Sequence, residues 1–449
     1  MPISLIVGPP NSGREGEVLG RLKASLRADP VLVVPTGDDA ARFERELCRE
    51  GGTVLGVSIR TFGSLFEDVA RSLALRLAPP LKRPERLALV GAAVTATPLR
   101  LLGRSAARPG FAPALETLIG ELQASLVSPR ELAAAAAELA DGDYESELAA
   151  LYESYGELRD RPGRSDAGSR AEATLRALRA EPEAWSGRPV FIYGFDDLTR
   201  AQLELVGELG RSSEVVVAVN YADREALVAG APLLAECMEL GATVAEQVEH
   251  DPGYTDRESL RHLDRFLFEP ESRPVEPDGG VVLLECAGEL GEAEAIGAEI
   301  ARLLADGVPP DEIAVVARDV ARRGPALGRV LARLELPVAV EASVPLDQTA
   351  VGSSLVALCR AASAAGEPAD LLGHLRADPA MAPEAAAWLE RRIRRRRPAS
   401  IDEAIEGWKA PPRHLATVRA ASGPAARMRA LAAIARELAE ELPGDRRGA

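Results

Sequence analysis

The 449-residue sequence contains 69 acidic and 53 basic residues, a net charge of −16 that argues against non-specific nucleic-acid binding but permits local basic patches. Its 47% hydrophobic content is sufficient for ordinary globular cores and excludes a disordered chain. The cysteines form no CxxC pair, and no apolar stretch reaches the roughly 20 residues of a membrane span, so we expect a cytoplasmic chain with reduced thiols and no membrane contact.

The N-terminal part reads as alternating strands and helices. Residues 3–7 form an apolar run that leads into a glycine loop, and a helix is predicted from about Glu15. Residues 31–34 and 54–59 are further short apolar runs, each followed by turn residues or by a helical pattern. This alternation is typical of an α/β fold in which crossover helices connect the strands of a parallel sheet.

The pattern changes several times further along the chain. Apolar residues at three- and four-residue steps predict an all-helical insertion, after which strands resume at 189–193 and 214–220. A proline- and glycine-rich linker then precedes a second α/β unit, with strands expected at 281–286 and 313–317 and helices after Ser353. The predicted segments are 1–78 (α/β), 79–182 (helical insertion), 183–268 (α/β, continued), 269–280 (linker), 281–352 (second α/β unit, incomplete) and 353–449 (helical).

The glycine loop after the first strand has the spacing of a phosphate-binding loop. Gly8 and Gly13 enclose four residues between a strand and a helix, as in the Walker A motif. The lysine position is occupied by Arg14 and the Ser/Thr position by Glu15, whose negative charge would face the phosphates and compete for Mg²⁺. The loop is therefore a degenerate nucleotide site or, alternatively, a glycine turn that joins strand to helix.

A second segment, residues 193–202, resembles motifs II and III of UvrD-like superfamily 1 helicases. Gln202 falls on a position that matches the motif, whereas Tyr193 and Gly194 replace the Mg²⁺-binding aspartate and the water-activating glutamate. An apolar run that ends in Gly-Phe, followed by this glutamine, looks like the B subunit of AddAB helicase–nucleases. In that family the helicase core is typically kept as a scaffold after its active residues are lost.

Other segments agree with this resemblance. Thr61 and Phe62 match the family's Thr-Phe element, which makes them DNA-binding candidates. Residues 148–166 look like the helix and aspartate that precede motif II. Residues 292–318 are similar to the start of the second motor domain, with Arg318 at the motif IV arginine that contacts the γ-phosphate in active members. The alternative for Arg318 is a surface arginine at a helix end.

The resemblance implies two RecA-like P-loop domains with all-helical insertions. It implies a non-hydrolysing, DNA-binding scaffold in double-strand break repair and recombination, with an AddA-type partner subunit and no catalytic residue of its own. No PD-(D/E)XK nuclease core or terminal cysteine group is recognisable, so an Fe–S cluster and Mg²⁺ are expected only if a nuclease domain follows. An active P-loop helicase, and an interaction scaffold without DNA contact, are the alternatives.

Three smaller features complete the sequence analysis. A dense basic run is a candidate contact to the DNA backbone, or alternatively a solvated helix end: Arg391, Arg392, Arg394, Arg395, Arg396 and Arg397. The adjacent carboxylates Asp196 and Asp197 are predicted to be a helix N-cap and its neighbour rather than a metal pair. The four histidines are scattered along the sequence, so we predict no metal site.

Overall fold

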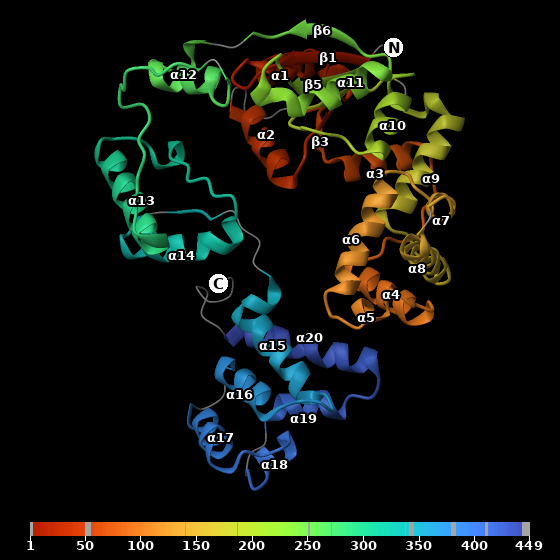
Figure 1. Ribbon diagram of the computed structural model, residues 1–449, viewed down its shortest axis with the longest axis vertical. Coiled ribbons are helices and arrows are strands. Elements are labelled where there is room, and N and C mark those ends of the chain that lie inside the picture. The colour runs from red at the N-terminus through yellow and green to blue at the C-terminus, as the bar shows by residue number, and fades with distance from the viewer. Residues whose placement is uncertain are drawn as a thin grey trace. The chain divides into compact units, whose positions relative to one another are not determined.

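The computed structural model describes residues 3–49, 55–139, 141–185, 187–249, 252–270, 272–336, 338–340, 345–378, 383–408 and 412–441. The chain divides into two compact units, Met1–Val282 and Leu283–Ala449 (Figure 1). Within the described residues, no helix is long and apolar enough to cross a membrane.

A six-stranded parallel sheet forms the centre of unit 1. The strands lie in the order β3-β2-β4-β5-β1-β6. They are β1 (Ile3–Gly8), β2 (Val31–Val33), β3 (Ser58–Arg60), β4 (Val190–Ile192), β5 (Val215–Asn220) and β6 (Thr243–Gln247). The predicted α/β class and parallel sheet are thus confirmed. The carboxyl ends of β1, β4 and β5 meet at one edge, where ligands of open α/β sheets usually bind.

Helices cover both faces of this sheet. The helices of unit 1 are α1 (Arg14–Ala24), η1 (Leu26–Ala28), α2 (Gly37–Arg49), α3 (Phe62–Ser72), α4 (Arg83–Ala96), α5 (Gly103–Ala106), α6 (Phe111–Ala124), α7 (Pro129–Ala137), α8 (Asp143–Asp160), α9 (Ala167–Ala180), η2 (Pro182–Trp185), α10 (Arg200–Leu209), η3 (Glu225–Gly230), α11 (Ala231–Glu239), η4 (Pro252–Tyr254) and α12 (Glu258–Phe266). Apolar side chains of α1 and α2 pack on one face. Those of α3, α9, α10 and α11 pack on the other, because successive strand residues point to opposite faces.

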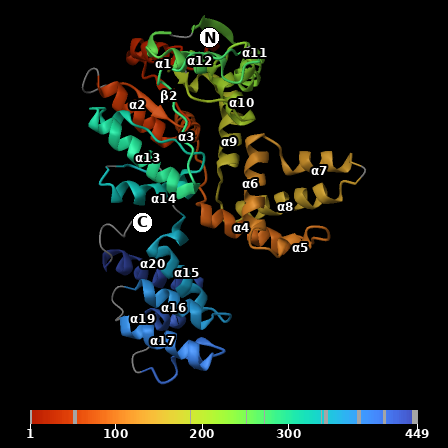
Figure 2. The ribbon, with the colours of Figure 1, turned by 60° about the vertical axis from the view of Figure 1, so that its left-hand side comes forward.

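The helices between β3 and β4 build a core of their own. Buried residues of α4, α6 and α8, including Tyr152 and Tyr155, pack together away from the sheet. Figure 2 shows α4 to α8 standing apart from the strands, with α9 leading back to them. The two ends of this helical segment meet where Leu81 N donates to Ser165 O at 2.7 Å and Ser165 N donates to Pro79 O at 3.1 Å.

Among the described residues of unit 2, helices are the regular secondary structure. Its helices are α13 (Gly288–Ala305), η5 (Pro310–Glu312), α14 (Val320–Arg333), η6 (Leu346–Gln348), α15 (Ala350–Ala362), α16 (Pro368–Ala377), α17 (Pro383–Arg396), α18 (Ile401–Ile405), α19 (Arg413–Ala420) and α20 (Pro424–Glu441). Ion pairs from Arg322, Arg323 and Arg333 of α14 to glutamates of α13 join these two helices. Helices α15 to α20 share a separate apolar core.

The prediction of strands at 281–286 and 313–317 is wrong. Both segments have irregular backbone and no ladder partner among the described residues, and Leu283 and Val316 are 84% and 93% exposed. Their apolar pattern predicts burial in a sheet. A strand exists only where a neighbouring strand accepts its backbone hydrogen bonds, and no such neighbour is present in the described part of unit 2.

Candidate functional site

Two glycines fix the turn between β1 and α1. Gly13 has a φ of 75° and is the N-cap of α1, a left-handed conformation that favours glycine. At Gly8 a Cβ atom would lie 2.6 Å from the carbonyl oxygen of Val248, so only glycine fits beside this backbone. Both glycines of the loop therefore occupy positions where a side chain is unfavourable.

Arg14 is turned inward to the protein. Its Nε donates to the carbonyl oxygen of Pro9 at 3.3 Å, and a terminal nitrogen donates to Asn220 Oδ1 at 3.1 Å, at the end of β5. Burial lowers the pKa of this guanidinium. Two of its donors are thus satisfied by the loop and the neighbouring strand.

Glu15 is also paired within the protein. Its carboxylate accepts hydrogen bonds from Arg42 of α2 at 3.0 and 3.3 Å. Arg42 lies 4.2 Å above the ring of Phe43, which meets Tyr193 edge-on at 5.6 Å. Burial and the negative charge of Glu15 raise the pKa of the Tyr193 phenol. Glu15, Arg42, Phe43 and Tyr193 therefore form one connected group beside the loop, which we call the loop cluster.

The segment after β4 differs from its prediction in one respect. Gly194 turns the chain with a φ of 88°, and Asp196 and Asp197 are exposed. The cap of α10 is Thr199, whose hydroxyl accepts from Gln202 N at 3.4 Å while Gln202 Oε1 accepts from Thr199 N at 2.8 Å. The assignment of the aspartates as N-cap and neighbour is wrong, because the capping box lies further along the chain.

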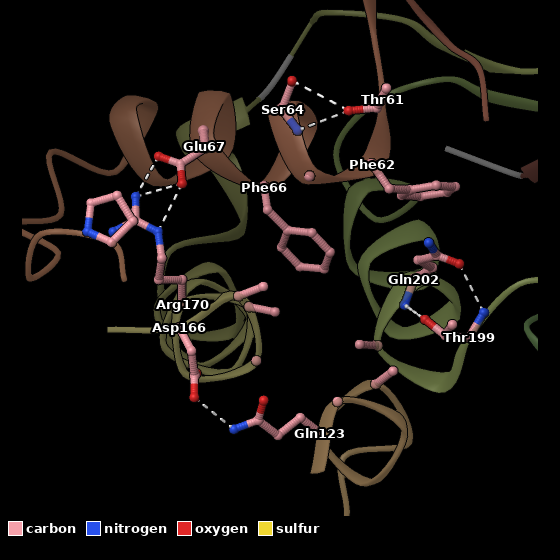
Figure 3. A pocket seen from close by; sticks show the side chains of 18 of the residues that line it. Thr61, Phe62, Ser64, Phe66, Glu67, Gln123, Asp166, Arg170, Thr199 and Gln202 are labelled. Carbon is pink, nitrogen blue, oxygen red and sulfur yellow. Dashed lines mark hydrogen bonds and ion pairs between the residues drawn. The ribbon is translucent and has the colours of Figure 1, made fainter. Parts of the chain in front are cut away.

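A cavity of about 570 Å³ opens between α3, α6, α9 and α10 (Figure 3). Thr61 and Phe62, the predicted DNA-binding pair, line it together with Thr199 and Gln202. The Thr61 hydroxyl caps α3 by accepting from Ser64 N at 3.4 Å. Figure 3 shows Phe66 projecting from α3 into the space between α9 and α10.

Phe62 contributes more to the core than to this cavity. It is 5% exposed, and its ring meets Phe195 edge-on at 5.1 Å. A base could stack only on an accessible aromatic face, and Phe66, which is partly buried, fits that requirement better. The motifs in the sequence did not select Phe66. The one signal that could have found it is its four-residue spacing from Phe62, which places both residues on the same face of α3.

Ion pairs and hydrogen bonds hold the opposite wall of the cavity. Arg170 of α9 pairs with Glu67 of α3. The buried carboxylate of Asp166 accepts from Gln123 of α6 at 3.0 Å, from Tyr155 at 2.8 Å and from Ser169 N at 2.8 Å, and it pairs with Arg159 at 3.2 Å. Burial alone would raise the pKa of Asp166, but the hydrogen bonds and the charge of Arg159 lower it to about 2.

The basic run occupies the end of α17, and its arginines differ in environment. Arg392 is inward-facing: it donates to the carbonyl oxygen of Glu403 at 2.9 Å and lies 5.4 Å above the Trp388 ring. Arg394 pairs with Glu390 at 2.6 Å. The exposed members of the basic run are Arg391, Arg394, Arg395, Arg396 and Arg397.

Two of the four histidines, described as scattered from the sequence, in fact lie in contact. His374 Nε2 lies 3.1 Å from His414 Nδ1, in a buried position of unit 2. They are separated by 40 residues in the sequence, and helix packing brings them together. Separation along the sequence therefore does not keep this pair apart in the fold, and the absence of a metal site stays a prediction.

Part of the chain aligns with bacterial proteins that are named as the B subunit of an ATP-dependent helicase/deoxyribonuclease. The protein of Pelotomaculum thermopropionicum is 29% identical over 279 residues, which cover 55% of this chain and 23% of the relative. Proteins of two strains of Desulfitobacterium hafniense are 26% identical over 256 residues, or 49% of this chain and 20% of each relative. The chain is a distant relative of these B subunits.

The resemblance predicted from the motifs is thus confirmed, although no protein-family model matches the chain. The match to the B subunits spans only about a fifth of their length. Their name describes them as subunits of an enzyme that is both a helicase and a deoxyribonuclease.

The structure groups the residues suggested by the B-subunit motifs in three places. Arg14, Glu15 and Tyr193 lie together at the glycine loop, whereas Gln202 lines the cavity beside Thr61. Arg318 belongs to unit 2, where it lies in the turn before α14. Arg42 and Asn220, which satisfy Glu15 and Arg14, were missed from the sequence. Asn220 could have been found because it ends a strand next to β1.

Proposed function

We propose that this chain is a non-hydrolysing, DNA-contacting scaffold subunit of a helicase–nuclease complex in double-strand break repair and recombination. Its proposed partner is an active, AddA-type helicase subunit. The observation that carries the proposal is the self-pairing of the degenerate loop: Arg14 bonds to Pro9 and Asn220, and Glu15 bonds to Arg42. The charged groups that a triphosphate and Mg²⁺ would need are satisfied by the protein.

Electrostatics supports the absence of hydrolysis. A carboxylate about 4 Å from a phosphate charge is repelled by about 4 kcal/mol at an effective dielectric constant of about 20. Arg42 offsets the charge of Glu15 but supplies no metal ligand. Tyr193 and Gly194 offer neither a carboxylate for Mg²⁺ nor a base for the attacking water.

The test of hydrolysis is a phosphate-release assay on the purified chain with single-stranded DNA and Mg²⁺. We expect no turnover. The variant Gly13→Val serves as the control, because a side chain at a φ of 75° would distort the loop. Turnover of about 1 s⁻¹ or more that Gly13→Val abolishes would show that the chain is an active ATPase.

We propose that single-stranded DNA is contacted at the cavity between α3, α6, α9 and α10. Thr61, Ser64 and Gln202 offer hydrogen-bonding groups there, and Phe66 offers an aromatic ring. Arg86 and Arg170 also line the cavity, each paired with a glutamate. Stacking of a base on an aromatic ring contributes about 1–3 kcal/mol and tolerates any sequence. These features favour DNA contact over an interaction scaffold without it.

A larger side chain at Gly120 tests this cavity directly. Gly120 of α6 lines the cavity, and a Cβ there would meet nothing within 4 Å, so the side chain of Gly120→Phe begins without a clash. Gly91 of α4 is equally unobstructed but is not among the residues that line the cavity, which makes Gly91→Phe the matched control. We expect Gly120→Phe to weaken single-stranded DNA binding about tenfold or more in fluorescence anisotropy. Equal affinity of the two variants would assign DNA binding elsewhere or to no part of the chain.

We further propose that α13 and α14 belong to a second RecA-like domain. The order of a helix, an apolar segment at 313–317 and Arg318 supports this proposal, because it matches the start of the second motor domain in the family that the chain resembles. The exposed apolar side chains of 281–284 and 315–316 would become buried if a sheet formed on them.

A further inference from the structure

Four helices of unit 2 bring together a cluster of buried polar side chains. His374 and Asp378 come from the end of α16, His414 from the start of α19, Ser354 from α15 and Glu437 from α20. His374, Asp378 and His414 are 0%, 4% and 3% exposed. The nitrogen and oxygen atoms that these three offer lie within 4.8 Å of one another.

We propose that His374 Nε2, His414 Nδ1 and an Asp378 carboxylate oxygen bind one divalent transition-metal ion of the Zn²⁺ class. Two imidazoles and one carboxylate are a common protein donor set for Zn²⁺, whereas Mg²⁺ and Ca²⁺ prefer oxygen ligands alone. The ion would tie α16 to α19 inside the helical core. Neither the resemblance nor the relatives' names point to a metal at this place.

The distances fit a tetrahedral ion. Ligand atoms about 2.0–2.2 Å from a tetrahedral Zn²⁺ are separated from one another by about 3.3–3.5 Å. His374 Nε2 and His414 Nδ1 are 3.1 Å apart, and His414 Nδ1 and Asp378 Oδ2 are 3.4 Å apart. The third pair, His374 Nε2 and the Asp378 carboxylate oxygen, lies within 4.8 Å and closes by up to about 1.4 Å around a tetrahedral ion.

The second nitrogen of each ring has a polar partner, and that of His414 is a carboxylate, as is common for metal-bound histidines. His374 Nδ1 lies 2.8 Å from the Ser354 hydroxyl, and His414 Nε2 lies 3.4 Å from Glu437 Oε2. Such outer partners fix the ring orientation and make the facing nitrogen a better ligand. Arg413 pairs with Glu437 and so holds this carboxylate in place.

The proton inventory also favours a cation. A neutral imidazole has one N–H and one lone pair. If His414 donates from Nε2 to Glu437, its Nδ1 presents a lone pair toward the Asp378 carboxylate. A metal ion bound by this nitrogen and by the carboxylate turns the repulsion between the two groups into attraction.

The test uses the full chain, stripped of metal with a chelator and then titrated with Zn²⁺ against a chromophoric chelator. The wild-type chain should bind one Zn²⁺, and Asp378→Asn should bind it at least about tenfold more weakly. His262→Asn is the matched control, because His262 lies outside the cluster, in α12. Circular dichroism of each variant reports its folding, and a rise in Tm with added Zn²⁺ is expected for the wild type and for His262→Asn.

Co²⁺ provides a readout that does not depend on any variant. Bound by the wild-type chain, Co²⁺ should give the intense visible absorption of a four-coordinate ion, and Zn²⁺ should displace it. A weak, octahedral-type spectrum, or Zn²⁺ binding by Asp378→Asn as tight as by the wild type, would overturn the proposal. In that case the cluster would be a hydrogen-bonded core that holds no ion.

Discussion

Asp166 joins α6, α8 and α9 beside the cavity, and its replacement should loosen these three helices selectively. Its carboxylate caps α9, accepts from Tyr155 of α8 and binds Gln123 of α6. Asp166→Ala removes the cap, at a cost of about 1 kcal/mol, and leaves the buried Tyr155 hydroxyl without this acceptor, at about 1–3 kcal/mol. The expected loss is therefore about 2–4 kcal/mol in the local stability of α6, α8 and α9.

Hydrogen exchange followed by mass spectrometry measures this loss locally, which suits a chain with two units that need not unfold together. Amides of α8 and α9 should exchange faster in Asp166→Ala, while those of β1 and β5 should be unchanged. Asp166→Asn keeps a capping oxygen and should therefore lose less local stability than Asp166→Ala. If the opening free energies of the α8 and α9 amides in Asp166→Ala match those of the wild type to within about 0.5 kcal/mol, the assigned role of Asp166 is refuted.

The same carboxylate makes stability depend on pH. The folded-state pKa of about 2 lies below the ordinary value of 3.8, so the stabilisation is present above about pH 4 and is lost as pH falls toward 2. The difference is equivalent to about 2.5 kcal/mol. In thermal unfolding monitored by circular dichroism, the gap in Tm between wild type and Asp166→Asn should close over this interval. A gap that is constant from about pH 6 to about pH 2.5 would contradict the low pKa.

Three other outcomes follow from particular contacts. Burial raises the pKa of the Cys237 thiol to about 11. With a thiol reagent at about pH 8, the three exposed cysteines should therefore react at once and Cys237 only after unfolding. Fast reaction of a fourth thiol would contradict this. Gly8→Ala should lower Tm, because its Cβ would lie 2.6 Å from the Val248 carbonyl oxygen; an unchanged Tm would show that the loop can shift. Replacing Arg395 and Arg396 with Ser should reduce the slope of log single-stranded DNA affinity against log salt concentration by about 1.4. Arg392→Ser should instead reduce stability, because Arg392 is largely buried. An unchanged slope in the double variant would make the run a solvated helix end.

The sequence predicted the central strands of unit 1 because all of them are buried on both faces. Continuous apolar runs of that kind occur mainly in parallel sheets covered by helices. The edge strand β6 was missed because most of its side chains are exposed and its residues, Thr243–Gln247, are partly polar. The segments 281–286 and 313–317 failed for the opposite reason: they have the apolar pattern but lack a neighbouring strand among the described residues.

The candidate sites could be predicted only where their residues are close together in the sequence. The glycine loop and its substitutions Arg14 and Glu15 could be found from spacing alone. The partners of these residues lie 206 and 27 positions away, and the His374–His414 contact spans 40 positions. Such pairs depend on how helices and strands pack, which no local pattern in the sequence encodes.

The backbone hydrogen bonds that join Ser165 to Pro79 and Leu81 affect how the sequence can change in evolution. Because the helical segment leaves and re-enters the α/β framework at a single point, its length does not alter the distance that the framework must bridge. Residues can therefore be added between α4 and α8 without moving the strands, as long as the bonds of α6 and α8 to Asp166 are kept. The length of the insertion can vary while the sheet that supports the loop cluster remains the same.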